Sequence, residues 1–330
     1  MKWKFYSLAF VAGMSILTAC SSDDNNDNDG NGGNGNGNEI ENGTILKGTI
    51  TSDVTLAAGN TYKLSGEYIV EEGATLHIEE GVKIIAVYDD IADYILVKQG
   101  GKINAVGTPD KPIVMTSEKE EPGAWGGIHI CGRAHTNAEG GKGSSEIGGA
   151  VYGGNDDADN SGTLQYIRLE YTGFAFDEEH EANGISFYGV GNGTIVDHCQ
   201  AYKGSDDGFE FFGGSVNVSN LVAVSCSDDS FDWTEGWNGK GTNLVAYQEA
   251  ESTLGYDCDC LMECDNNGSN NAATPVAHPV LKNLILVGNG GSKQGIRLRA
   301  GTEVEIDNAK VCGKGQPLTV ETALDRKSVV

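Results

Sequence analysis

Acidic residues recur at a fixed interval in the middle of the chain. Residues 205–211 (SDDGFEF) and 227–233 (SDDSFDW) share one pattern and lie 22 residues apart. Together they supply six carboxylates, Asp206, Asp207, Glu210, Asp228, Asp229 and Asp232. Carboxylate oxygens in such numbers suit Ca²⁺, which takes six to eight oxygen ligands. The alternative is a solvated acidic surface on which mutual repulsion raises the carboxyl pKa values.

The same carboxylates could also act on a polysaccharide. A glycoside hydrolase needs two carboxyl groups either about 5 Å or roughly 6.5–9.5 Å apart, and an array of stacked acidic residues can supply such pairs. A calcium-dependent lyase needs a base beside the metal as well. Lys203, Lys240, Arg297 and Arg299 are available, and no motif specifies one of them.

A second candidate calcium site lies at residues 157–162 (DADNSG), which match the first half of a calcium-binding loop. Its ligands would be Asp157 and Asp159. The twelfth position of the loop is Arg168 in place of the usual bidentate glutamate. A turn rich in Asp and Asn between two strands is the alternative interpretation.

Tryptophan and cysteine residues offer further candidates. Trp125 and Trp237 could stack on sugar rings, the alternative being packing inside the fold. Cys258, Cys260 and Cys264 lie close together in a segment rich in Cys and Asn. Their spacing favours a local disulfide over a zinc site, because zinc ligands usually show a two-residue knuckle spacing or a nearby histidine.

A short repeat provides the framework for these residues. The segments that start at Val196, Val218 and Gly241 share one pattern, and their starts lie 22 and 23 residues apart. The pattern also occurs at residues 164–169, 281–286 and 306–311. Six copies indicate a solenoid, and the period-2 apolar positions with Gly- and Asn-rich turns make each coil β. The sequence therefore predicts an all-β, right-handed parallel β-helix over residues 44–324, with coils of about 22 residues and insertions near 172–183 and 248–278.

Stacked coils bring the acidic residues into vertical register. Asp206 should lie over Asp228, Asp207 over Asp229 and Glu210 over Asp232, about 4.8 Å apart. The aromatic residues between them should point inward, which leaves Asp206, Glu210, Asp228 and Asp232 facing solvent. Each stacked pair repels by about 1 kcal/mol in water, and bound Ca²⁺ would reverse that sign. In this respect the array resembles the calcium tracks of parallel β-helix pectate lyases.

Asparagines occupy one repeated position, at Asn220, Asn243 and Asn283. Their side chains can form a hydrogen-bonded ladder along the coils. Alternatively, asparagine is present because it tolerates the left-handed conformation of a bend. Cys199 stands at the position equivalent to Leu221, which predicts a buried small side chain rather than a nucleophile.

The N-terminus has the features of an export signal. Residues 1–19 carry two lysines, an apolar run and the ending Leu-Thr-Ala before Cys20, which resembles a bacterial lipobox. This resemblance implies cleavage before Cys20 and its acylation. Residues 21–24 (SSDD) resemble the surface-export signal of Bacteroidota lipoproteins. Residues 20–43 should form a flexible tether of Asp, Asn and Gly, so we expect a lipid-anchored protein exposed on the outer membrane.

Three further segments carry a family resemblance. They are residues 122–127 (PGAWGG), 152–162 (YGGNDDADNSG) and 205–214 (SDDGFEFFGG). Together they resemble a large group of Bacteroidota β-helix lipoproteins, over roughly residues 44–320 of this chain. The resemblance implies the pectate-lyase-like fold and export, and no established activity.

The last six residues, 325–330 (DRKSVV), match the translation of a widely used sequencing adapter. We therefore expect an artefact at this end and missing C-terminal coils. The preceding residues 320–324 are typical of a strand interrupted within a coil.

Charge limits the partners. The formal net charge is −26, and it becomes −28 without Lys2 and Lys4 of the signal. Nucleic acids and anionic membranes attract clustered basic residues, so neither is expected as a partner apart from contact through the lipid anchor. The sequence favours a non-catalytic protein that binds an extracellular polysaccharide or matrix glycan. The alternatives are a Ca²⁺-dependent polysaccharide lyase or glycoside hydrolase, and a structural adhesin or spacer.

Overall fold

The computed structural model describes residues 38–89, 91–176 and 180–321. The predicted signal peptide, Cys20, most of the tether and residues 325–330 lie outside the described residues. Among the described residues, no helix is long and apolar enough to cross a membrane.

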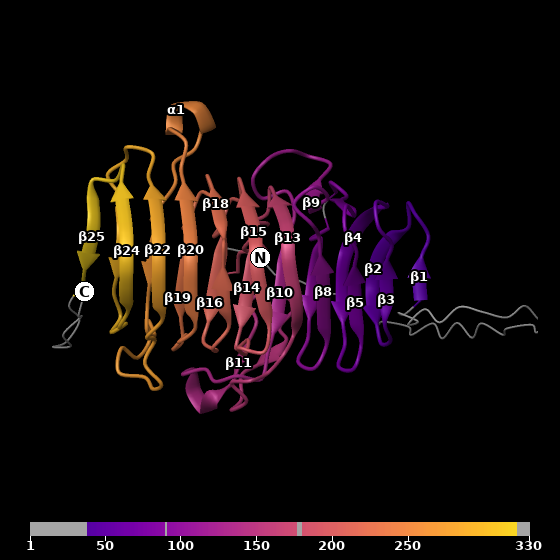
Figure 1. The fold of residues 1–330 in the computed structure, drawn as a ribbon, viewed down its shortest axis with the longest axis horizontal. Helices are drawn as coiled ribbons and strands as arrows, with labels where there is room; N and C mark the ends of the chain where they lie inside the picture. The colour runs from indigo at the N-terminus through magenta and orange to yellow at the C-terminus, as the bar shows by residue number, and fades with distance from the viewer. Residues whose placement is uncertain (1–37, 90, 177–179, 322–330) are drawn as a thin grey trace, which may run out of the picture. The chain divides into compact units, whose positions relative to one another are not determined.

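The described chain winds as a right-handed parallel β-helix in which each coil contributes strands to three faces (Figure 1). Face 1 consists of β1 (Asn38–Ile40), β3 (Val54–Leu56), β5 (Thr75–Ile78), β8 (Lys102–Val106), β17 (Asn217–Ser219) and the first halves of β13 (Gly162–Glu170), β15 (Ile195–Tyr202), β20 (Lys240–Tyr247), β22 (Val280–Val287) and β24 (Glu305–Cys312).

Face 2 continues each of these coils after a bend. It consists of the second halves of β13, β15, β20, β22 and β24, the first halves of β2 (Ile45–Ile50) and β4 (Thr61–Val70), and β6 (Lys83–Ala86), β9 (Ile113–Ser117) and β18 (Val222–Val224).

Face 3 completes the coil, and it carries Glu210 and Asp232, while the other repeated aspartates lie in the turns that lead into it. It consists of the second halves of β2 and β4, followed by β7 (Tyr94–Val97), β10 (Ile128–Cys131), β14 (Ile185–Tyr188), β16 (Phe209–Phe212), β19 (Phe231–Thr234), β21 (Met262–Cys264), β23 (Gln294–Leu298) and β25 (Gln316–Val320).

One apolar core runs through the coils, because alternate residues of every strand point inward. On face 3 the rings of Phe209 and Phe231 stack at 5.6 Å between centroids, and Phe211 stacks on Trp237 at 4.2 Å. The predicted inward direction of Phe209, Phe211, Phe231 and Trp233 is confirmed, since all four side chains are buried. Cys199 is buried in register with Leu221, also as predicted.

The bend between faces 1 and 2 is built by left-handed residues that bond to one another. Asn220, Asn243, Asn283 and Asn308 have φ angles of 54°, 57°, 59° and 63°. Each side-chain amide in this series, from Asn243 onward, donates to the carbonyl oxygen of the preceding asparagine at 2.8–2.9 Å. Both interpretations of the asparagines therefore hold at once. The ladder is largely exposed, so solvent competes for its hydrogen bonds.

A long excursion between β10 and β13 was not predicted. It contains η1 (Glu139–Gly141) and the antiparallel pair β11 (Gly143–Ser144) and β12 (Val151–Tyr152), below the coils in Figure 1. Its side chains join outward residues of face 3 in a second apolar cluster, which includes Leu96, Cys131, Ile147, Tyr152, Tyr188 and Phe212. The excursion therefore covers part of face 3.

Two predicted boundaries need correction. The fold begins before residue 44, since β1 pairs in parallel with β3. The segment 248–278 is only in part an insertion: it holds α1 (Glu251–Leu254), but it also supplies β21 to face 3. Cysteine and aspartate content hid the alternating pattern of this strand.

Candidate functional site

The acidic residues form one array on face 3, which we call the acidic column. The register places Glu210 against Asp232 and Asp232 against Glu263, as the predicted stacking of the first two coils requires. The third coil was missed, because residues 258–265 (CDCLMECD) were assigned to a loop. The column consists of Asp206, Asp207, Glu210, Asp228, Asp229, Asp232, Asp259, Glu263 and Asp265.

The carboxylates approach one another closely. They form three groups of three residues, and in each group one carboxyl oxygen from every residue lies within 4.8 Å of the other two. The groups are Asp206–Asp207–Asp228, Asp207–Glu210–Asp232 and Asp229–Asp232–Glu263. These groups share members, so the negative charge is continuous over the coils of β16, β19 and β21.

Two of the aspartates hold successive coils together. Oδ1 of Asp207 accepts a hydrogen bond from the backbone N–H of Asp229 at 2.8 Å. Oδ1 of Asp229 accepts one from the backbone N–H of Cys260 at 2.6 Å. Both aspartates are buried. They therefore satisfy backbone groups that would otherwise lack a partner at the turn leading into face 3.

Among the described residues, the ion pairs of lysine and arginine with the column are confined to its last coil. Arg297 bonds to Glu263 at 2.8 Å, Arg299 to Asp265 at 2.7 Å and also to Glu263. Lys293 pairs with Asp259 at 2.6 Å. Within the described residues, no lysine or arginine forms an ion pair with the six carboxylates of the two preceding coils, from Asp206 to Asp232.

The column is less exposed than predicted. Asp228 is exposed, but Glu210 and Asp232 are half-buried and Asp206 is only 8% exposed. One reason is the amide of Asn183, a buried residue ahead of β14, which donates to Oε2 of Glu210 at 2.5 Å. The segment that precedes β14 thus shields part of the column from water.

Burial and mutual repulsion favour the protonated forms. Burial, followed by the charge of Asp228, raises the pKa of Asp206 to about 8. Burial also raises the pKa values of Asp207, Glu210, Asp229 and Asp232 well above their usual range, with neighbouring carboxylates adding to the effect. Without a cation, the folded protein therefore binds protons here.

Two oxygens at the column have no hydrogen-bond partner although solvent does not reach them. They are Oδ1 of Asp232 and Oδ1 of Asn183, whose amide nitrogen already bonds to Glu210. Buried polar atoms are normally satisfied, so each oxygen is a candidate ligand atom. Asn183 was not found from the sequence, because it precedes the strand in a coil that lacks the repeated aspartates.

The excursion adds a further carboxyl group. Glu146 accepts a hydrogen bond from the hydroxyl of Tyr188 at 3.2 Å. Burial raises its pKa to about 7, although Tyr188 opposes the shift. Its charge also contributes to the raised pKa values of Asp206 and Glu210. No repeat or motif in the sequence singles out Glu146.

The other predicted calcium ligands, Asp157 and Asp159, lie outside the acidic column and bond to neighbouring side chains. Asp157 accepts a hydrogen bond from the His135 ring at 2.7 Å, and Asp159 accepts one from the hydroxyl of Ser161. Burial alone would raise the pKa of Asp157, but the bonds from His135 outweigh it and lower the pKa. Neither aspartate belongs to a cluster of potential metal ligands among the described residues. The second calcium site therefore stays a prediction.

The predicted sugar-stacking role of Trp125 and Trp237 is wrong. Both side chains are buried, and their ring nitrogens donate to the backbone carbonyls of Glu170 and Val216. Trp237 also stacks on Phe211 inside the coils. These tryptophans fill the core and offer no ring face to a ligand.

The local disulfide expected among Cys258, Cys260 and Cys264 does not form. All three thiols are free and buried. Cys264 pairs in register with Trp233 and points into the core, because it belongs to β21 rather than to a loop. Burial raises the pKa of Cys258 to about 12, which makes its thiol unreactive.

These features define a right-handed parallel β-helix protein with a carboxylate-rich outer face. The family model described as a pectate-lyase like β-helix domain matches residues 48–330, and the chain belongs to this family. No curated protein matches the chain.

One similar solved structure is the catalytic domain of a GH87 α-1,3-glucanase, with one substitution and in complex with tetrasaccharides. It shares 11% identity and a TM-score of 0.31, over 81% of this chain and 64% of that one. A likeness this distant says nothing about the activity of this chain.

Proposed function

We propose that this protein binds a glycan outside the cell and that its acidic column holds Ca²⁺. The observation that carries the calcium site is the group of carboxylates from Asp206 to Asp232, which has no ion pair to a lysine or arginine of the described residues. Oδ1 of Asp232 in this group and Oδ1 of Asn183 beside it have no hydrogen-bond partner there either. Glu263 and Asp265 on the next coil already have arginine partners. A cation would take the place of such partners on the two coils before it.

Chemistry and energetics both favour calcium. Carboxylate and amide oxygens are ligands of a hard cation, and Asn183 adds a neutral oxygen to those of Glu210 and Asp232. Two like charges 4.8 Å apart repel by about 1 kcal/mol in water and by about 3–4 kcal/mol at an effective dielectric constant of 20. A divalent cation turns that repulsion into attraction.

Membership of the pectate-lyase like β-helix family supports the proposal that the ligand is a glycan. Export and acylation of Cys20 belong to the same proposal, since a surface-anchored protein meets extracellular polysaccharide. Labelling with a palmitate analogue tests the anchor: the full chain should incorporate the label, and Cys20→Ala should not. Incorporation by Cys20→Ala at the wild-type level would exclude acylation at this residue.

A glycoside hydrolase is the second candidate, favoured by the close approach of two carboxyl groups. Carboxyl oxygens of Glu210 and Asp232 lie no more than 4.8 Å apart, and glycoside hydrolases act through such pairs of neighbouring carboxyl groups. For a lyase, Arg297 and Arg299 are candidate bases that form ion pairs with the last coil of the same column.

A polysaccharide panel tests binding and turnover together. The purified chain is incubated with each polysaccharide in calcium and in chelator, and bound protein, new reducing ends and unsaturated products are measured. The proposal predicts retention by at least one polysaccharide without products. Reducing ends would favour the hydrolase, unsaturated uronides would favour the lyase, and absence of binding to the whole panel would contradict glycan recognition.

A further inference from the structure

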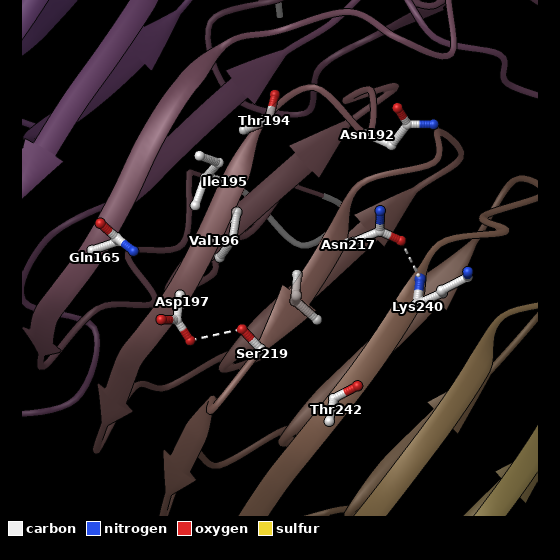
Figure 2. A pocket seen from close by; sticks show the side chains of 11 residues that line it. Gln165, Asn192, Thr194, Ile195, Val196, Asp197, Asn217, Ser219, Lys240 and Thr242 are labelled. Carbon is white, nitrogen blue, oxygen red and sulfur yellow. Dashed lines mark hydrogen bonds between the residues drawn. The ribbon is translucent and has the colours of Figure 1, made fainter.

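A second candidate site lies on face 1, away from the acidic column. A shallow groove of about 510 Å³ crosses β13, β15, β17 and β20 (Figure 2). Most of the residues that line it are of polar types, and only two are charged: Gln165, Asn192, Thr194, Ile195, Val196, Asp197, Asn217, Val218, Ser219, Lys240 and Thr242.

The groove is built from two rows of outward side chains. The register places Gln165, Asp197, Ser219 and Thr242 in one row, one residue per coil. The neighbouring row contains Ile195, Asn217 and Lys240. Successive members of a row are spaced by about 4.8 Å, the distance between strands. Polar groups therefore repeat along the axis of the coils.

Some of these polar groups hold the coils together. Oδ1 of Asp197 accepts hydrogen bonds from the hydroxyl of Ser219 and the amide of Asn220, each at 2.7 Å. Oδ1 of Asn217 accepts one from the backbone N–H of Lys240 at 2.9 Å. Figure 2 shows the contacts of Ser219 and Lys240 as dashed lines.

Other groups in the groove remain free to bind a ligand. Within the described residues, the side chains of Gln165, Asn192 and Thr242 and the ammonium of Lys240 form no hydrogen bond or ion pair. Gln165, Asn192 and Thr242 each combine donor and acceptor capacity. Such groups match the hydroxyls of a sugar, which also donate and accept.

The groove offers apolar contact as well. Ile195, the apolar member of the second row, is 51% exposed. At the bend beside Gln165 and Asp197, the rings of Tyr166 and His198 stack at 4.5 Å, and His198 is exposed. The C–H faces of a sugar ring pack on such surfaces, while its hydroxyls reach the polar rows.

We propose that this groove binds a linear, neutral glycan along the axis of the coils. Asp197 and Lys240 leave the lining without net charge, and the net charge of −26 on the chain repels polyanions. Peptide strands are poor occupants, since β15 already bonds to a strand on each side and no open edge is left. The inference rests on the proposed glycan binding and adds its place and its ligand class.

Binding of neutral hexasaccharides, by calorimetry, tests the groove. An oligouronate of the same length serves as the charged comparison. In the variant Gln165→Ala/Thr242→Ala two free hydrogen-bonding groups are lost, and affinity should fall about tenfold or more at roughly 1 kcal/mol per bond. The matched control is Gln200→Ala/Thr253→Ala, which removes the same groups from face 2 and from α1, and it should bind like the wild type.

The outcomes separate the groove from the function. Neutral glycan binding that survives in Gln165→Ala/Thr242→Ala would place the glycan elsewhere and overturn the groove, with glycan binding intact. Preference for the oligouronate would overturn the neutral ligand class. If the wild-type protein binds neither the neutral hexasaccharides nor the oligouronate, both the proposed glycan binding and the groove as its site are overturned. Far-ultraviolet circular dichroism of each variant shows whether the coils are retained.

Discussion

At the scale of single residues, the acidic column contains carboxylates with two different tasks. Asp207 and Asp229 each accept a backbone N–H from the next coil, so they act on the fold. Within the described part of the chain, the side chains of Asp206, Asp228 and Asp232 accept no such bond across coils, and their carboxyl oxygens are left as ligands for a cation. Substitutions should separate these two roles.

Asp229→Ala should destabilise the fold more than Asp229→Asn. The alanine leaves the N–H of Cys260 without its acceptor, at a cost of about 1–3 kcal/mol. The asparagine keeps an oxygen in place and removes one of the repelling charges. Urea denaturation of both variants in chelator measures the difference. Equal losses for alanine and asparagine would mean that the bond to Cys260 contributes little.

The raised pKa values predict how stability depends on pH. Asp206 and Glu146 have folded-state pKa values of about 8 and about 7, whereas unfolded Asp and Glu titrate near pH 4. Between about pH 4 and pH 8 the folded state binds more protons than the unfolded state, so stability falls as pH rises.

Thermal melting in chelator across this range measures the effect. The melting temperature should decrease from pH 5 to pH 8, and saturating Ca²⁺ should reduce the decrease. A melting temperature that rises over the same interval in chelator would contradict the protonated column.

At the scale of elements, the strands that repeat at a constant period could be predicted from the sequence. The strands from Val196 onward and the stacking of Glu210 on Asp232 follow from a spacing of 22 residues. β21 was missed, because the insertion before it breaks the period. Glu146 and Asn183 reach the column through tertiary packing of non-repeating segments, which no local pattern encodes.

The asparagine ladder allows its two contributions to be separated. Asn243 has a φ of 57° and both donates to and accepts from its neighbours in the ladder. Asn243→Gly keeps the left-handed bend and loses the ladder bonds, whereas Asn243→Ala also incurs about 1–2 kcal/mol of backbone strain. Chemical denaturation should therefore rank wild type, glycine and alanine in decreasing stability. Alanine as stable as glycine would show that the bend tolerates an ordinary residue.

At the scale of the whole molecule, a chain with a net charge of −26 gathers many of its carboxylates on one face. The coil containing Lys293, Arg297 and Arg299 neutralises one end of the column. The coils before it are not neutralised in this way. A cation there would join face 3 across successive coils, so metal binding and the stability of the β-helix should be coupled.

Calcium titration of the chelator-treated protein tests the central claim most directly. Isothermal calorimetry should show saturable Ca²⁺ binding that Asp232→Asn and Asp228→Asn each weaken at least tenfold. The control Asp110→Asn, an exposed aspartate outside the column, should leave it unchanged, and Ca²⁺ should raise the melting temperature of the wild type. Absence of saturable binding, or binding that persists unchanged in Asp232→Asn, would contradict a calcium site in the acidic column.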